Sequence, residues 1–206
     1  MAGIIGRKIG MTRVFDGQGN SVPVTVIEAG PCYITQIKTE DVDGYDAVQI
    51  GFEDKKEKNT IKPELGHYAK AGVKPKRILK EFHSFDNLAQ LKLGDEIKVD
   101  SFEEGQTVTV TGWSRGKGFQ GVVKRHGFGG GPKTHGQSDR LRAPGSIGQS
   151  SSPSKVFKGV RMGGRMGNAR VTLAKKRVLK IVPERNIMMI EGTIPGSRAG
   201  LVIIKN

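Results

Sequence analysis

The chain has 206 residues, 35% of them hydrophobic, and its 34 Lys and Arg outnumber its 20 Asp and Glu to give a net charge of +14. This positive charge indicates a polyanionic partner, and a nucleic acid is favoured over a membrane surface because the sequence shows no basic amphipathic helix. The single cysteine excludes an intramolecular disulfide, and the absence of any apolar run of about 18 residues excludes a transmembrane helix.

The N-terminal quarter of the chain predicts three short strands. Residues 1–15 are too broken by glycine and charge for a signal peptide, so we expect a cytoplasmic protein with no membrane partner. β-branched and alternating residues predict strands at 22–28, 32–38 and 45–52, separated by Gly, Pro and Asp-Gly turns. Pro23 favours an edge strand or the start of a strand. Strands at this spacing are typical of a barrel or a sandwich.

The middle of the chain is less regular. Residues 53–59 are a charged run that predicts a loop, and Pro63 favours a short helix over residues 63–71. Residues 75–82 fit a helical turn and a short strand equally well. Alternation then predicts strands at 96–99 and 105–111.

Strand signals return after residue 170. Residues 171–182, 187–191 and 201–204 are β-branched or apolar and are separated by Gly and Pro turns. We therefore expect one mainly β globular domain built from residues 1–111 and 171–206, with a small, partly helical insertion around residues 60–90. Residues 112–170 form a long excursion from this domain.

That excursion, the basic segment, carries most of the charge. It holds twelve Lys and Arg, half of the 30 glycines, and Asp139 as its one acidic residue. It has too few apolar residues to form its own core, yet it contains Trp113, Phe119, Phe128 and Phe157. Such a segment is typical of one that folds against a nucleic acid.

The predicted nucleic-acid contacts are the basic and histidine side chains of this segment, because cations neutralise phosphates and glycine allows the backbone to approach them. They are Arg115, Lys117, Lys124, Arg125, His126, Lys133, His135, Arg140, Arg142, Lys155, Lys158, Arg161, Arg165 and Arg170. No histidine has a partner at metal-ligand spacing, so no metal site is expected.

One motif suggests another function. GKGFQG at residues 116–121 fits the glycine fingerprint of a dinucleotide site and follows a predicted strand. A helix and a second strand should then follow, whereas the sequence continues with a Gly-rich run from Gly127 to Pro132. We therefore favour close approach to phosphates over a cofactor site.

The motifs IGRKIGMTRVF, VPVTVIEAGP, DGYDAVQIGF, PGSIGQ, KVFKG and RMGGRMGN together resemble the bacterial branch of the large-subunit ribosomal protein L3 family. The resemblance covers almost the whole chain. It implies a closed six-stranded β-barrel of the translation-protein type, with a long, largely irregular basic extension inserted between barrel strands. It also implies a structural protein without catalysis, cofactor or small-molecule substrate.

The same resemblance implies binding to 23S rRNA early in assembly, an extension that approaches the peptidyl-transferase centre, and contacts with neighbouring large-subunit ribosomal proteins. Gln149 lies in the PGSIGQ context in which some family members carry an N5-methylglutamine, made by a glutamine methyltransferase. Two alternatives stay open. One is an RNA-modifying or nucleotide-dependent enzyme built around GKGFQG, and the other is a free-standing barrel that binds nucleic acid generically.

Overall fold

A computed structural model describes residues 3–15, 17–83 and 91–206. The chain divides into two compact units. The first, here called the barrel unit, comprises Met1–Trp113 and Arg170–Asn206, and the second, the basic unit, comprises Ser114–Ala169.

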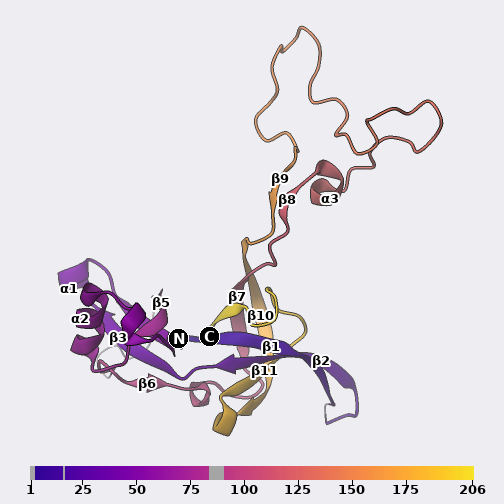
Figure 1. The fold of residues 1–206 in the computed structure, drawn as a ribbon. Coiled ribbons are helices and arrows are strands. Elements are labelled where there is room, and N and C mark those ends of the chain that lie inside the picture. Colours follow the sequence, from indigo (N-terminus) through magenta and orange to yellow (C-terminus); the bar gives the residue numbers. More distant parts are fainter. Residues whose placement is uncertain (1–2, 16, 84–90) are drawn as a thin grey trace. The chain divides into compact units, whose positions relative to one another are not determined.

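Six antiparallel strands of the barrel unit form a closed barrel (Figure 1). In order around the barrel they are β1 (Gly3–Phe15), β12 (Leu201–Lys205), β7 (Thr107–Trp113), β10 (Arg170–Val182), β11 (Ile187–Glu191) and β2 (Ser21–Ala29). The barrel closes because β1 pairs with β2 on one side and with β12 on the other. The mainly β fold with a six-stranded barrel is therefore confirmed.

β-branched side chains fill the interior of the barrel. Ile4 of β1, Ile27 of β2, Val110 of β7, Ile190 of β11 and Ile204 of β12 are each fully buried. Each such side chain contributes about 1.5–3 kcal/mol when it leaves water. In β7, which alternation predicted, Val108 and Val110 are buried and Thr107 and Thr109 are not, so the period of two reports the face that points into the core.

β1 is a strand that the sequence did not predict. Glycine and charge interrupt residues 3–15, but pairing with two neighbours fixes their extended backbone. Pro23 marks the start of β2 and not a sheet edge, because β2 pairs with both β1 and β11. The β11 pairing ends at Val24, so the missing N–H of Pro23 leaves that ladder intact, and its carbonyl accepts a hydrogen bond from Gly192 N.

Two glycines of β1 give a matched pair of substitutions. A Cβ on Gly6 would lie 2.5 Å from the Glu28 carbonyl oxygen, whereas a Cβ on Gly10 would meet no atom within 4 Å. We expect Gly6→Ala to lower the free energy of unfolding by about 1–3 kcal/mol, because the backbone of β2 must move. Gly10→Ala should leave it unchanged or raise it slightly. Urea unfolding of both variants measures this, and a Gly6→Ala protein as stable as the wild type would contradict it.

A four-stranded sheet lies between β2 and β7 in the chain. Its strands, in order across the sheet, are β5 (Lys76–Phe82), β4 (Ala47–Asp54), β3 (Cys32–Lys38) and β6 (Glu96–Ile97). The short helix α1 (Glu40–Asp43) follows β3, and α2 (Lys62–Ala71) follows β4. Among its described residues the unit also contains the one-turn 3-10 helices η1 (Glu57–Asn59), η3 (Val99–Ser101) and η4 (Pro183–Arg185).

The structure resolves several predictions for this part of the chain. The helix expected from residue 63 is present and begins at Lys62, with Pro63 in its first turn. Residues 76–82 are a strand, because pairing with β4 decides between the two conformations that the sequence allowed. The prediction of a loop at 53–59 is partly wrong, since β4 continues to Asp54 and η1 follows. Residues 84–90 of the expected insertion lie outside the described residues.

An ion pair joins the sheet to the barrel within this unit. Arg7 of β1 donates from Nε and Nη2 to the two carboxylate oxygens of Glu53, the second bond being 2.8 Å. Glu53 has φ of +58°, a conformation that non-glycine residues seldom adopt. The hydrogen bonds from Arg7 hold the pKa of Glu53 below its usual value. The barrel and the sheet also share one hydrophobic core, which includes Ile50 and Phe82 of the sheet.

The basic unit has little regular structure. It contains the paired strands β8 (Gly118–Gln120) and β9 (Gly164–Met166) and the one-turn helix α3 (Val122–His126). Residues 127–163 contain no helix and no strand. The chain leaves the barrel at Trp113 and re-enters it at Arg170, and these two residues are partners in the β7–β10 ladder.

Candidate nucleic-acid interface

A short antiparallel ladder forms the stem of the basic unit. Gly118 pairs with Met166, and the amide of Lys117 donates to the Met166 carbonyl at 2.9 Å. Gly167 has φ of +73°, and a Cβ there would lie 2.1 Å from the Arg115 carbonyl oxygen. Only glycine fits this close approach, so the GKG and MGN motifs hold the two sides of the stem together.

Two side chains of α3 form hydrogen bonds to the chain that returns toward β9. The guanidinium of Arg125 donates to the Met162 carbonyl oxygen at 2.7 Å, and the His126 ring Nε2 donates to the same oxygen at 3.0 Å. The ring of Phe128 contacts that of His126, with centroids 5.9 Å apart. Arg125 and His126, both predicted to contact nucleic acid, therefore also hold the start of the irregular stretch 127–163 close to its end at Met162.

Thirteen of the fourteen predicted contact residues lie in the basic unit, and Arg170 is the first residue of β10. Arg125 and His126 are half-buried, and the other twelve side chains are exposed. Those twelve are Arg115, Lys117, Lys124, Lys133, His135, Arg140, Arg142, Lys155, Lys158, Arg161, Arg165 and Arg170.

The cations of the two units differ in their partners. In the barrel unit, carboxylates pair with Arg7, Lys38, Lys55, Lys76, Arg77, Lys98 and Arg177. Among the described residues, no carboxylate forms an ion pair with any Lys or Arg of Ser114–Ala169. The eleven Lys and Arg of the basic unit face a single acidic residue, Asp139. Their charge is therefore left for a partner outside the chain.

The aromatic residues of the basic segment also differ in whether the protein itself covers them. Trp113 belongs to β7 and packs against the core of the barrel unit. Phe119 is 80% exposed and Phe157 is 55% exposed, which leaves their rings open to an external ligand. Phe128 is half-buried. Exposed rings between unpaired cations are typical of surfaces that stack unpaired bases.

The GKGFQG motif has a different context from the one expected. A helix does follow its glycines, contrary to the prediction, but α3 has five residues and ends at Gly127 in the left-handed conformation. β8 pairs with β9 in antiparallel fashion, whereas a dinucleotide-binding unit requires parallel strands joined through a helix. The motif therefore builds the stem of the basic unit.

No catalytic or metal centre emerges from the described part of the chain. No three His, Cys, Asp or Glu side chains among the described residues are placed to hold a metal ion. Burial raises the pKa of the Cys32 thiol to about 12, so this cysteine is a poor nucleophile. Within the same residues, no helix is long and apolar enough to cross a membrane.

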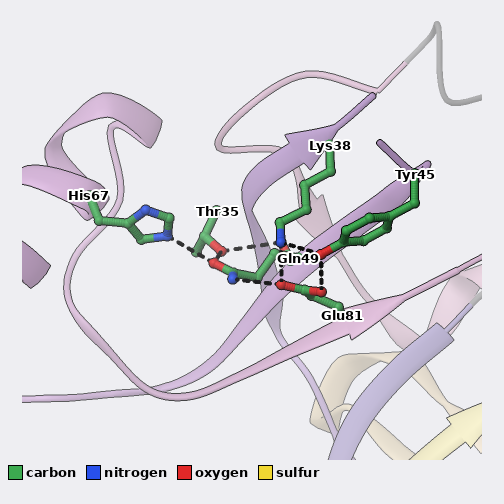
Figure 2. Close-up of polar contacts among 6 residues, drawn as sticks. All are labelled: Thr35, Lys38, Tyr45, Gln49, His67 and Glu81. Atoms are coloured by element: carbon green, nitrogen blue, oxygen red, sulfur yellow. Dashed lines mark hydrogen bonds and ion pairs between the residues drawn. The ribbon is translucent and has the colours of Figure 1, made fainter. Parts of the chain in front are cut away.

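A polar cluster of six residues in the barrel unit serves its own fold (Figure 2). The amide oxygen of Gln49 accepts hydrogen bonds from Thr35 Oγ1 at 2.9 Å and from His67 Nε2 at 2.8 Å. Glu81 accepts from Lys38 at 2.9 Å and from the Tyr45 hydroxyl at 3.1 Å. The network joins β3, β4, β5 and α2, and its groups satisfy one another, so we assign it a structural role.

This network predicts a pH-dependent stability difference. The hydrogen bond from Lys38, followed by that from Tyr45, lowers the pKa of Glu81 against the opposing effect of burial. A carboxylate with a lowered pKa stabilises the fold above its unfolded pKa of about 4.3 and loses that contribution as the pH falls through the folded value. Glu81→Gln should therefore destabilise the protein more at pH 7 than at pH 3.

Thermal unfolding at both pH values measures the difference. Glu184→Gln is the control, since Glu184 is exposed and forms no ion pair with another described residue. An equal loss of stability for Glu81→Gln at pH 7 and pH 3 would refute the assignment.

The sequence did not predict the folding back of residues 128–145. The amide of Gly131 donates to the Leu141 carbonyl at 2.8 Å, and a Cβ on Gly130 would lie 2.4 Å from the same oxygen. The run of three glycines before Pro132 is the signal that could have indicated it, because consecutive glycines permit such an approach between two backbones.

Known proteins similar to this chain share one family. The family model described as "Ribosomal protein L3" matches residues 83–186. The chain is 56% identical over 196 residues to the "Large ribosomal subunit protein uL3" of Chloroherpeton thalassium, covering 95% of this chain and 94% of that protein. It is 52% identical over 204 residues to the protein of the same name from Chlorobium phaeovibrioides, covering 99% of this chain and 98% of that one. The chain therefore belongs to the ribosomal protein L3 family.

Proposed function

We propose that the protein is a structural constituent of the large subunit of cytoplasmic ribosomes and that its basic unit binds 23S rRNA. The observation that carries the proposal is the charge of Ser114–Ala169, whose eleven Lys and Arg have no acidic partner among the described residues. The names of the relatives support the ribosomal setting. A folded barrel with an irregular cationic excursion suits a protein that stabilises RNA architecture without catalysis.

The proposal includes the roles that family resemblance implies. The protein would join the subunit early in assembly, reach toward the peptidyl-transferase centre with its basic unit, and contact neighbouring ribosomal proteins. The irregular backbone of residues 127–163 supports the first two roles, because a segment that lacks its own core can adapt to RNA as the RNA folds.

Modification of Gln149 is part of the same proposal. Its side chain is exposed, which suits access by a glutamine methyltransferase. Peptides that span Gln149, taken from native ribosomes, should carry one extra methyl mass. An unmodified peptide from cells that contain the methyltransferase would remove this role.

The test compares 23S rRNA with an unrelated RNA duplex as ligands for the purified protein at one salt concentration. Two variants that each lose three positive charges distinguish the contribution of the basic unit to RNA binding from that of the barrel unit. The loop-charge variant carries Lys133→Gln, Arg142→Gln and Lys158→Gln, and the barrel-charge variant carries Lys56→Gln, Lys58→Gln and Lys62→Gln. We expect tighter binding to rRNA than to the duplex, and a larger loss of affinity in the loop-charge variant. Equal affinity for both RNAs, or equal losses in both variants, would contradict the proposal.

A further inference from the structure

A cavity lies within the folded-back residues of the basic unit. Its volume is about 470 Å³, and its lining includes Phe128, Gln137, Arg140, Pro144 and the three glycines at 129–131. We call it the Phe128 pocket. Two close contacts hold its walls together: the Gly131 amide bonds to the Leu141 carbonyl, and Gly130 lies against the same oxygen.

The lining combines three kinds of group. Phe128 offers an aromatic ring, and contact with the His126 ring holds it in place, while His126 is itself bonded to Met162. Gln137 offers an amide that can donate and accept, and its nitrogen lies 3.0 Å from the position of a Cβ on Gly131. Arg140 offers a planar set of N–H donors. Ring, amide and guanidinium together suit a flat ligand with donors and acceptors on its edge.

The size and surroundings of the pocket narrow the choice of ligand. A phosphate needs neither an aromatic wall nor a cavity of about 470 Å³. Lys133 and Arg142 are exposed cations next to the residues of the pocket and can hold phosphates outside it. An unpaired base that is still attached to its RNA accounts for both the cavity and the cations, because its ring fills the cavity while its sugar-phosphate backbone contacts the cations.

We propose that the Phe128 pocket receives one unpaired base of the bound RNA, stacked on Phe128 and contacted on its edge by Gln137 and Arg140. This rests on the proposed function, in which the same unit binds rRNA. The pocket adds a base-specific contact to an interface that otherwise neutralises phosphates. It also gives the glycine run a role, since side chains at 130 and 131 would collide with the backbone of residues 140 and 141.

Photo-crosslinking provides the first test. The complex of the full protein with 23S rRNA is irradiated at 254 nm and digested with nuclease and protease, and the peptides are analysed by mass spectrometry. A nucleotide adduct on Phe128 is the expected result. Adducts confined to Phe119 and Phe157, the exposed phenylalanine rings of the basic unit, would overturn the proposal, because they would place the stacked bases elsewhere.

Affinity measurements provide the second test. Phe128→Ala should weaken rRNA binding about 5- to 150-fold, the range for the loss of one stacked base. Arg140→Gln should weaken it more than Arg142→Gln, although both remove one charge, because only Arg140 lines the pocket. Each variant is first checked for unchanged thermal unfolding of the barrel unit.

The outcomes separate this proposal from the wider one. Phe128→Ala within twofold of the wild type, with Arg140→Gln equal to Arg142→Gln, would refute the pocket while leaving rRNA binding by the unit intact. A wild-type protein with no preference for 23S rRNA would refute both.

Discussion

Raising the salt concentration from 50 to 200 mM is expected to weaken binding of the wild-type protein to 23S rRNA by about 10³- to 10⁵-fold. That range corresponds to about six to ten phosphate contacts, each of which releases condensed counterions, with a somewhat shallower slope for single-stranded RNA. The basic unit offers eleven Lys and Arg without acidic partners among the described residues, enough for contacts in this number. Filter binding at several salt concentrations gives the slope of log affinity against log salt.

The two charge variants sharpen this measurement. The slope for the loop-charge variant should be shallower by up to about three, since each lost phosphate contact removes about one. The barrel-charge variant should keep the wild-type slope. A flat salt response of the wild type, or the same change of slope in both variants, would show that the unpaired cations do not meet phosphates.

Replacing residues 128–161 with a four-residue Gly-Ser turn should leave a folded barrel and abolish specific RNA binding. The replacement keeps α3 and β9, whose ends lie close together because Arg125 and His126 both bond to Met162. The buried core residues of the barrel unit all lie outside the replaced stretch. We therefore expect its thermal midpoint to stay within about 3 °C of the wild type. Affinity for 23S rRNA should fall about 10³-fold or more, the usual gap between specific and non-specific binding.

A second variant separates length from charge. It keeps residues 128–161 but changes their six Lys and Arg to Gln, and it should bind almost as weakly as the shortened protein if charge dominates. Ribosome assembly in cells that carry only the shortened protein gives the functional readout. A shortened protein that unfolds would show that the irregular residues belong to the core, and one that supports normal assembly would show that they have no role in the ribosome.

The sequence predicted the strands that are rich in β-branched or apolar residues and missed those fixed by their partners. β2, β3, β11 and β12 are short and β-branched, so their local pattern was sufficient. β1 contains Gly3, Gly6 and Gly10, and its extended form depends on β2 and β12. Pairing partners far away in sequence cannot be read from composition. Resemblance to the family, and not periodicity, supplied the number of strands and the closure of the barrel.

Charge clustering located the candidate interface but not its internal contacts. The segment had almost no acidic residues, so the list of cations followed from composition alone. The inward bonds of Arg125 and His126 were not predictable, because they depend on where Met162 returns in three dimensions. The Phe128 pocket likewise arises from a fold-back between glycines 130–131 and residues 140–141, a contact that no local pattern encodes.

The pairing of β1 with β12 also has a consequence for synthesis. Gly3 is the partner of Lys205, so the barrel stays open until β12 has left the exit tunnel. At about 5–20 residues per second, roughly 10–40 s of translation separate the emergence of the two strands. The cationic residues at 114–169 emerge during that interval, when local pairs such as the β1–β2 hairpin are the ladders that can already form. The nascent chain thus presents the cations of its basic unit to surrounding polyanions before its globular fold is complete.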